Sequence, residues 1–201
     1  MANTSRINGF RVVKAFGMEN NSEVNLYYVA SAADEILVGD IVKLGGSADT
    51  NGNPTADLAG ASDVPVGVVV AILHSKFDPA GKMTTGSTAL DLPAAAQIAV
   101  SGAGYILVND SPDVILEGET SNGTPAAVDV GLNVSHANAA RTAATITSPA
   151  TIDIGTKNTT STLNFQLLGF VQRVGNEIGA SAKMLVRFNV HQYNSVGTTG
   201  V

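Results

Sequence analysis

The chain has 201 residues, of which 44% are apolar and only 14% are charged. Such a length suits one domain, and the apolar fraction is enough for a packed core, which argues against global disorder. The 11 basic and 17 acidic residues give a net charge of −6, which lacks the basic footprint of a nucleic-acid-binding protein, so we expect no nucleic-acid partner.

The N-terminal segment combines polar and basic residues in an otherwise acidic chain. Two interpretations stay open: ordinary surface charge, or a basic arm that docks on an acidic neighbour. On the second interpretation, residues 1–10 form an N-terminal arm. Its candidate contact residues, together with the start of the next segment, are Arg6, Phe10, Arg11 and Lys14.

Most of the chain is predicted to form short strands, because its apolar residues recur with a period of two and not 3.6. Near the C-terminus, Val186, Phe188 and Val190 alternate with polar residues. A phase slip at Leu167 and Leu168 predicts a β-bulge. The predicted strands are Arg11–Phe16, Asn25–Ala30, Asp40–Leu44, Val66–Leu73, Gln97–Val100, Tyr105–Val108, Val114–Glu117, Leu163–Leu167 and Val186–His191.

Turn-forming residues separate these strands. Asn8-Gly9, Asn51-Gly52 and Asn122-Gly123 supply backbone that tolerates positive φ. Gly67 interrupts an apolar strand, as glycine does where a strand bends sharply. Many short strands with such turns predict an all-β, mainly antiparallel fold, either a barrel or a sandwich.

Residues 118–162 differ from the rest in composition, since they contain no aromatic residue and no methionine. Such a stretch buries little apolar area per residue. We therefore expect a long Ala/Thr/Ser-rich insert of loops and short strands, packed on a neighbouring subunit or partly mobile, with Ser135–Ala144 as a weak helix candidate. The barrel core is then expected at 11–117 and 163–193, followed by a C-terminal tail at 194–201.

Neither cysteine nor histidine indicates a metal or a cofactor. Cysteine is absent, which excludes disulfides, iron–sulfur clusters and Cys-type zinc sites. His74, His136 and His191 lie far apart and lack ligand spacing. No P-loop, dinucleotide fingerprint or nucleophile elbow occurs. We therefore predict no catalytic residue, no metal, no cofactor and no enzymatic activity.

Two acidic stretches are candidate sites. Asp49–Asp57 places oxygen atoms at alternate positions, as a calcium loop does, but Pro54 stands where that loop needs glycine, so an Asx-rich turn is the better interpretation. Glu117 and Glu119 follow a short strand that Asp110 and Asp113 precede, and paired carboxylates can do acid–base work. We expect them to form a solvated rim.

Membrane insertion and secretion have little support in the sequence. The longest nearly apolar run is Val64–Leu73, about half of the roughly 20 residues that a membrane-spanning helix needs. The polar N-terminus has no signal-peptide apolar region. We expect a soluble chain without a membrane partner that is not exported by a cleaved signal.

Several segments resemble a known family. They are Ser5–Arg11, Asn25–Val29, Gly39–Leu44, Val66–Val69, Leu168–Glu177, Lys183–Val186 and Asn189–Gln192. These strand and turn patterns, spread over about half of the chain, resemble head decoration (cement) proteins of tailed bacteriophages. The segment 118–162 is not covered by the resemblance.

The resemblance implies a structural virion protein made in the host cytoplasm. Such proteins have small β-barrel or β-tulip-like cores, often form homotrimers and bind the outer surface of the capsid. Their partner is the major capsid protein, whose neighbouring subunits they bridge and stabilise. Two alternatives remain: another virion component, such as a head fibre base or tail protein, and a glycan-binding adhesion module.

Overall fold

The computed structural model describes residues 3–15, 23–30, 35–73, 97–98, 103–141 and 147–194. In these ranges the chain consists of thirteen strands and one short 3-10 helix. The predicted all-β, mainly antiparallel class with a small barrel is confirmed. Every predicted strand overlaps an observed one, although Phe16 and residues 99–100 at the ends of two predicted strands lie outside the described ranges, as do residues 195–201 of the expected tail.

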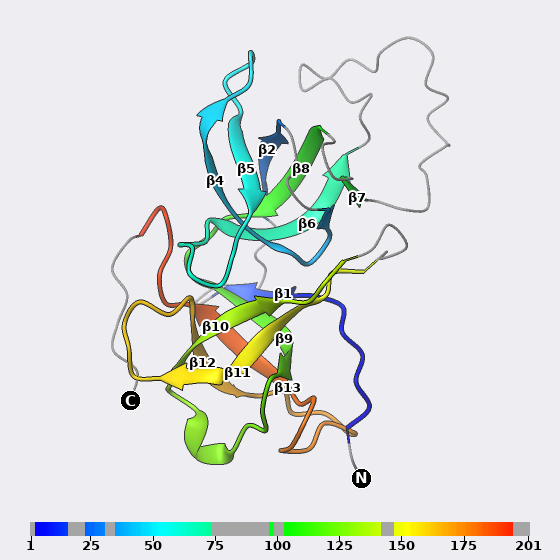
Figure 1. Cartoon of the computed structure of the whole chain (residues 1–201), viewed down its shortest axis with the longest axis vertical. Coiled ribbons are helices and arrows are strands. Elements are labelled where there is room, and N and C mark those ends of the chain that lie inside the picture. Colours follow the sequence, from blue (N-terminus) through cyan, green and yellow to red (C-terminus); the bar gives the residue numbers. More distant parts are fainter. Residues whose placement is uncertain are drawn as a thin grey trace.

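Five strands close into a small barrel, here called the first barrel (Figure 1). In pairing order they are β2 (Asn25–Val29), β5 (Pro54–Leu58), β4 (Ile41–Ala48), β6 (Gly67–Leu73) and β8 (Gly104–Asn109). The ring closes where β8 pairs with β2, and its one parallel seam joins Tyr28 to Thr55. Tyr27, Val29 and Ile106 are buried in its core.

Five more strands form a second closed ring. In pairing order they are β9 (Val114–Ser121), β13 (Lys183–Phe188), β12 (Phe165–Phe170), β10 (Asn133–Asn138) and β11 (Ala150–Asn158). The ring closes because β11 returns to β9 in a short parallel pairing, Ile152 opposite Thr120. A sixth strand, β1 (Arg11–Ala15), pairs with the start of β9.

Three short elements complete the described chain. The strands β3 (Ile36–Leu37) and β7 (Gln97–Ile98) pair with each other. The 3-10 helix η1 (Ala127–Asp129) lies between β9 and β10 in the chain. In the described ranges no helix is long and apolar enough to span a bilayer.

The expected insert is part of the second ring. Residues 118–162 contain β10, β11 and the end of β9, and Val134, Ile152 and Ile154 are buried in the core. The helix expected at Ser135–Ala144 is wrong, because this sequence begins in β10. Strands built from small Ala, Ser and Thr residues can enclose a packed core here, because phenylalanines from other segments fill the space between these strands.

The division into a core and an insert also differs from the observed one. The first barrel takes its strands from residues 25–109, whereas the second ring takes strands from both sides of residue 118. The segments 11–117 and 163–193 are therefore shared between two rings and do not form one barrel. The pattern of turns did not reveal this, because it marks strands but not their pairing partners.

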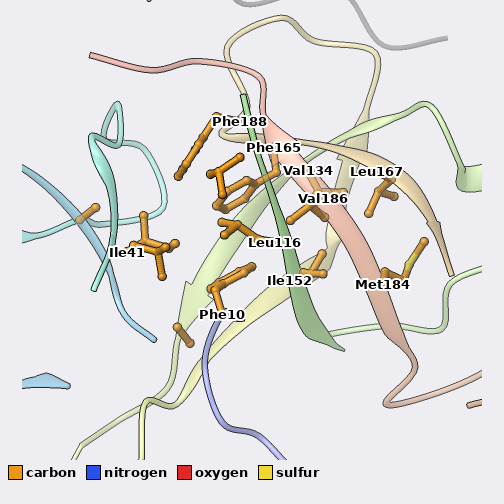
Figure 2. Packing of buried hydrophobic residues seen from close by; sticks show 14 of the residues in the cluster. Phe10, Ile41, Leu116, Val134, Ile152, Phe165, Leu167, Met184, Val186 and Phe188 are labelled. Atoms are coloured by element: carbon orange, nitrogen blue, oxygen red, sulfur yellow. The ribbon is translucent and has the colours of Figure 1, made fainter. Parts of the chain in front are cut away.

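Three phenylalanine rings stack in the centre of the second ring (Figure 2). Phe165 on β12 lies between Phe10 and Phe188, with ring centroids 5.1 Å and 5.2 Å away. The predicted inward phase of Val186 and Phe188 is confirmed, since both are buried. The bulge is confirmed too, because the β12–β13 register shifts just after Leu167.

A buried carboxylate joins the two rings. Asp40, directly before β4, accepts hydrogen bonds from Ser148 Oγ at 2.5 Å and from Arg141 Nη1 and Nη2 at 2.6 Å and 2.9 Å. Ser148 and Arg141 both lie in the connection between β10 and β11. The carbonyl oxygen of the preceding residue, Gly39, accepts a bond of 2.8 Å from the Phe10 N–H. Residues 39–40 thus hold the second ring and the N-terminal segment against the first barrel.

Two glycines permit close packing of neighbouring segments, Gly9 at this junction and Gly67 within the first barrel. Gly9 has φ +68°, and a Cβ there would lie 2.5 Å from Ser148 Cβ. A Cβ on Gly67 would lie 2.3 Å from the Asn109 carbonyl oxygen. The glycine that interrupts the predicted strand therefore serves the close packing of β6 on β8.

Replacing Phe165 by alanine tests the aromatic stack. Because the ring is fully buried between two others, Phe165→Ala is expected to lower the free energy of unfolding by about 3–5 kcal/mol. Chemical denaturation measures the loss, and Val128→Ala in the exposed η1 serves as the control with little effect. An unchanged denaturation midpoint for Phe165→Ala would contradict the stack's role.

Candidate interaction surface

The N-terminal segment is docked on the chain's own second ring. Its trace runs along the side of that ring, from β1 down to the far end (Figure 1). At that end Asn3 Nδ2 donates to the carbonyl oxygens of Glu177 and Ala180 at 2.8 Å and 2.9 Å, and Asn3 Oδ1 accepts from the Glu177 N–H at 2.8 Å. Residues 3–10 thus belong to the folded body.

The carboxylate of Glu119 on β9 binds the middle of this segment, and we call its contacts with Ser5, Arg6 and Lys183 the Glu119 clasp. This carboxylate is 2% exposed and accepts hydrogen bonds from Ser5 Oγ at 2.6 Å and from the Arg6 N–H at 2.8 Å. Lys183 Nζ lies 2.9 Å from the same carboxylate and donates to the Arg6 carbonyl oxygen at 2.6 Å. The solvated rim expected here is wrong for Glu119, which is a buried structural anchor.

The electrostatics of the clasp favour the ionised carboxylate. Burial acts to raise the pKa of Glu119, but hydrogen bonds from Ser5, Lys183 and the Arg6 N–H outweigh it and hold the pKa below its ordinary value of 4.5. The clasp is therefore strongest at neutral pH.

The four candidate contact residues lie in three different places. Phe10 is buried in the aromatic stack, so it is not available to a partner. Arg11 and Lys14 are exposed on β1. Arg6 is exposed beside a hollow at the far end of the second ring. These four residues are close together in the sequence, but the fold places them in different parts of the molecule.

The hollow lies between the N-terminal segment and the β12–β13 loop and has a volume of about 550 Å³. Three of its lining residues are basic. Arg173 is paired with Glu117 at 2.9 Å and Lys183 with Glu119, whereas no carboxylate of the described chain pairs with the Arg6 guanidinium. The lining residues are Asn3, Thr4, Arg6, Arg173, Val174, Gly175, Asn176, Ser181 and Lys183.

Exposed apolar side chains gather at the same end. In the described residues, four large apolar side chains are more than half exposed, and three of them are Val128, Val174 and Ile178. Val128 is in η1, and the other two are in the β12–β13 loop. Both segments lie at the end of the second ring that points away from the first barrel (Figure 1). We call these three residues and the hollow the distal end.

Large apolar side chains exposed at the same end of a body can serve as contact points for a partner, although singly exposed ones are ordinary. The sequence did not indicate this surface, because Val128 lies in the segment expected to be an insert, and because the exposure of Val174 and Ile178 depends on where the fold places the β12–β13 loop. An apolar residue flanked by Gly and Arg, as Val174 is, was the only available indication.

The histidines do not form a site in the described residues. His136 is buried, with Nε2 2.9 Å from the Ala59 carbonyl oxygen and Nδ1 3.1 Å from Asn164 Oδ1. Burial lowers the pKa of His136 and outweighs these bonds, which act to raise it. His191 is also buried, although its strand phase predicted the polar side, and His74 lies outside the described residues. In the parts the structure describes, no three His, Asp or Glu side chains are grouped to hold a metal ion.

The Asx-turn interpretation of residues 49–57 agrees with the structure. Asp49 Oδ1 accepts hydrogen bonds of 2.8 Å from the N–H groups of Asn51 and Asn53, and Asp49 Oδ2 accepts one of 2.9 Å from the Tyr105 hydroxyl. The carboxylate thus shapes the hairpin turn from β4 to β5. The residues after the turn form β5, a strand that the sequence did not predict.

Comparisons with known proteins identify no family. No family model, no curated protein sequence and no solved structure matches the chain.

The Glu119 clasp predicts a pH-dependent attachment of the N-terminal segment. Because the native pKa lies below the unfolded value, the clasp stabilises fully above about pH 4.5 and weakens as the pH falls through the native pKa. Hydrogen exchange at the Arg6 amide is expected to show strong protection at neutral pH that declines in acid. Glu119→Gln is expected to cost roughly 2 kcal/mol and to weaken this protection at every pH.

Glu117→Gln is the matched control, because Glu117 pairs with Arg173 and not with the N-terminal segment. If protection at Arg6 were the same in acid and at neutral pH, or if both variants changed it equally, the clasp would not be the attachment.

Proposed function

We propose that this protein decorates the outside of a tailed-bacteriophage head, where it bridges and stabilises neighbouring major capsid subunits. The observation that carries the proposal is the distal end, where Val128, Val174 and Ile178 are exposed at one extremity of a body with two closed strand rings. The resemblance of the strand and turn segments to decoration proteins supplies the identity of the partner.

The physical character of the body suits this role. Closed rings leave few strand edges to fray or to aggregate. A chain with only 14% charged residues has few charges from which water must be removed when a large surface is buried. The apolar side chains at the distal end supply the favourable burial, and the exposed Arg6 supplies attraction to acidic groups.

We propose further that three copies act together. A symmetric trimer touches several capsid subunits at once, and modest contacts then sum through a high effective concentration. The trimer would reside on the outer capsid surface of the virion, after synthesis in the host cytoplasm. The role requires no catalytic chemistry.

Binding to undecorated heads tests the distal end. The purified protein is expected to bind heads that lack their decoration protein and to raise the temperature at which they release DNA. Val174→Asp and Ile178→Asp together are expected to weaken binding by about tenfold or more without changing the melting temperature, because both side chains are exposed. Co-sedimentation with heads at graded protein concentrations measures the affinity.

Val24→Asp and Val64→Asp are the controls, since both valines are about two-fifths exposed and lie just before β2 and β6 of the first barrel. Equal losses for both pairs would contradict the assignment of the distal end. Absence of wild-type binding to heads would contradict the decoration role, and binding to tails alone would favour a different virion component. A monomeric mass in solution and on heads would contradict the trimer.

A further inference from the structure

We propose that the hollow at the distal end binds carboxylate side chains of a partner segment in which acidic residues alternate with apolar ones. The inference deepens the proposed function and rests on it, because it treats the distal end as the surface that meets the capsid subunit and names the chemistry that this subunit presents. Three features carry it: the charge of the hollow, its fixed walls and an exposed apolar side chain in its lining.

The hollow presents positive charge and no negative charge. It lies where the N-terminal segment runs beside the β12–β13 loop (Figure 1). Arg6, Arg173 and Lys183 line it, and none of the described residues that line it is acidic. Glu177, which follows the lining residue Asn176 in the sequence, is not among them. In a chain whose net charge is −6, a recess of this kind is a local attractor for anions.

Two of the three cations are already paired within the chain. The Arg173 guanidinium lies 2.9 Å from Glu117 Oε1, and the Lys183 ammonium lies 2.9 Å from Glu119 Oε2. Arg6 bonds Glu119 through its backbone N–H and not through its guanidinium. Among the described residues, therefore, the Arg6 guanidinium is the cation of the hollow without a carboxylate partner, and a planar guanidinium is well suited to bind one.

Both walls of the hollow are fixed before a ligand arrives. The Asn3 amide fastens the N-terminal segment to the β12–β13 loop through three hydrogen bonds. Across the loop, Asn176 Nδ2 donates to the carbonyl oxygens of Val171 and Lys183 at 2.8 Å and 2.9 Å, and Asn176 Oδ1 accepts from the Lys183 N–H at 2.7 Å. Because these bonds already order the walls, little conformational entropy is lost when a ligand enters.

An apolar side chain in the lining favours a peptide over a free anion. Val174 lines the hollow and is fully exposed to water. An inorganic anion bound at Arg6 would leave Val174 in water, whereas a peptide with an apolar residue next to its carboxylate would cover it. The volume of about 550 Å³ is that of a ligand site and accommodates such side chains. The occupant is therefore an acidic and apolar segment of a protein.

Amide NMR spectra of the full chain with synthetic peptides test the inference. The acidic peptide alternates glutamate with valine, and its control carries glutamine in place of glutamate. We expect the acidic peptide to shift the amide resonances of residues 3–6 and 173–183, and we expect added salt to weaken its binding. The glutamine peptide lacks the charge and inorganic phosphate lacks the apolar contact, so both are expected to bind at least about tenfold more weakly.

Neutralising Arg6 sharpens the test. Arg6→Gln removes the guanidinium but keeps the backbone bonds of the Glu119 clasp, so it is expected to bind the acidic peptide roughly tenfold more weakly at an unchanged melting temperature. Arg6→Lys keeps the charge and is expected to retain most of the affinity. Arg11→Gln is the matched control, because it changes the net charge equally but lies on β1 and not in the hollow.

Four results would overturn the inference: no shifts at residues 3–6 and 173–183 with the acidic peptide, equal binding of the glutamine peptide, equal binding of inorganic phosphate, or equal losses for Arg6→Gln and Arg11→Gln. The peptide experiment contains no capsid, so its failure is distinct from a failure of the decoration role. That role would fail if the wild type bound the acidic peptide but did not bind heads.

Discussion

The buried carboxylate of Asp40 is the interaction on which the arrangement of the whole molecule depends. It lies at the start of a strand of the first barrel, yet its partners Ser148 and Arg141 belong to a connection within the second ring. Removing a charge from water is costly, and only several hydrogen bonds together with a fixed cation offset this cost. Asp40 has both, and together with Ile41 and Val68, which pack into the core of the second ring, it holds the two rings in one relative position.

The N-terminal segment follows from this junction. Phe10 donates its N–H to Gly39, next to Asp40, while its ring fills the core of the second ring. From this point the chain runs one way into β1 and the other way along the second ring to Glu119. β1 and the distal end therefore belong to one continuously packed body. For the decoration role that we propose, such packing is favourable, because little motion has to be frozen on binding.

The sequence indicated most of the strands, but it did not locate β5, β10 or β11, and it did not indicate which strands pair. The alternation around Phe188 and the phase slip at Leu167 were legible because they are local. The pairing of β9 with both β11 and β13 is not local, and nothing in the composition of residues 118–162 indicated that their small residues complete a ring around phenylalanines from elsewhere. Likewise, Phe10 and Glu119 were expected at the surface. Both are buried by segments that lie far away in the sequence, and a local pattern does not indicate such burial.

The most direct measurement of the central claim is calorimetric unfolding of the wild-type chain beside Asp40→Asn. If the junction makes one body of the two rings, the wild type unfolds in a single transition with equal calorimetric and van't Hoff enthalpies. The variant, which loses the charge that holds Arg141, is then expected to unfold at a lower temperature, in a broadened or split transition. Two separate transitions in the wild type, or an unchanged single transition in the variant, would contradict the account.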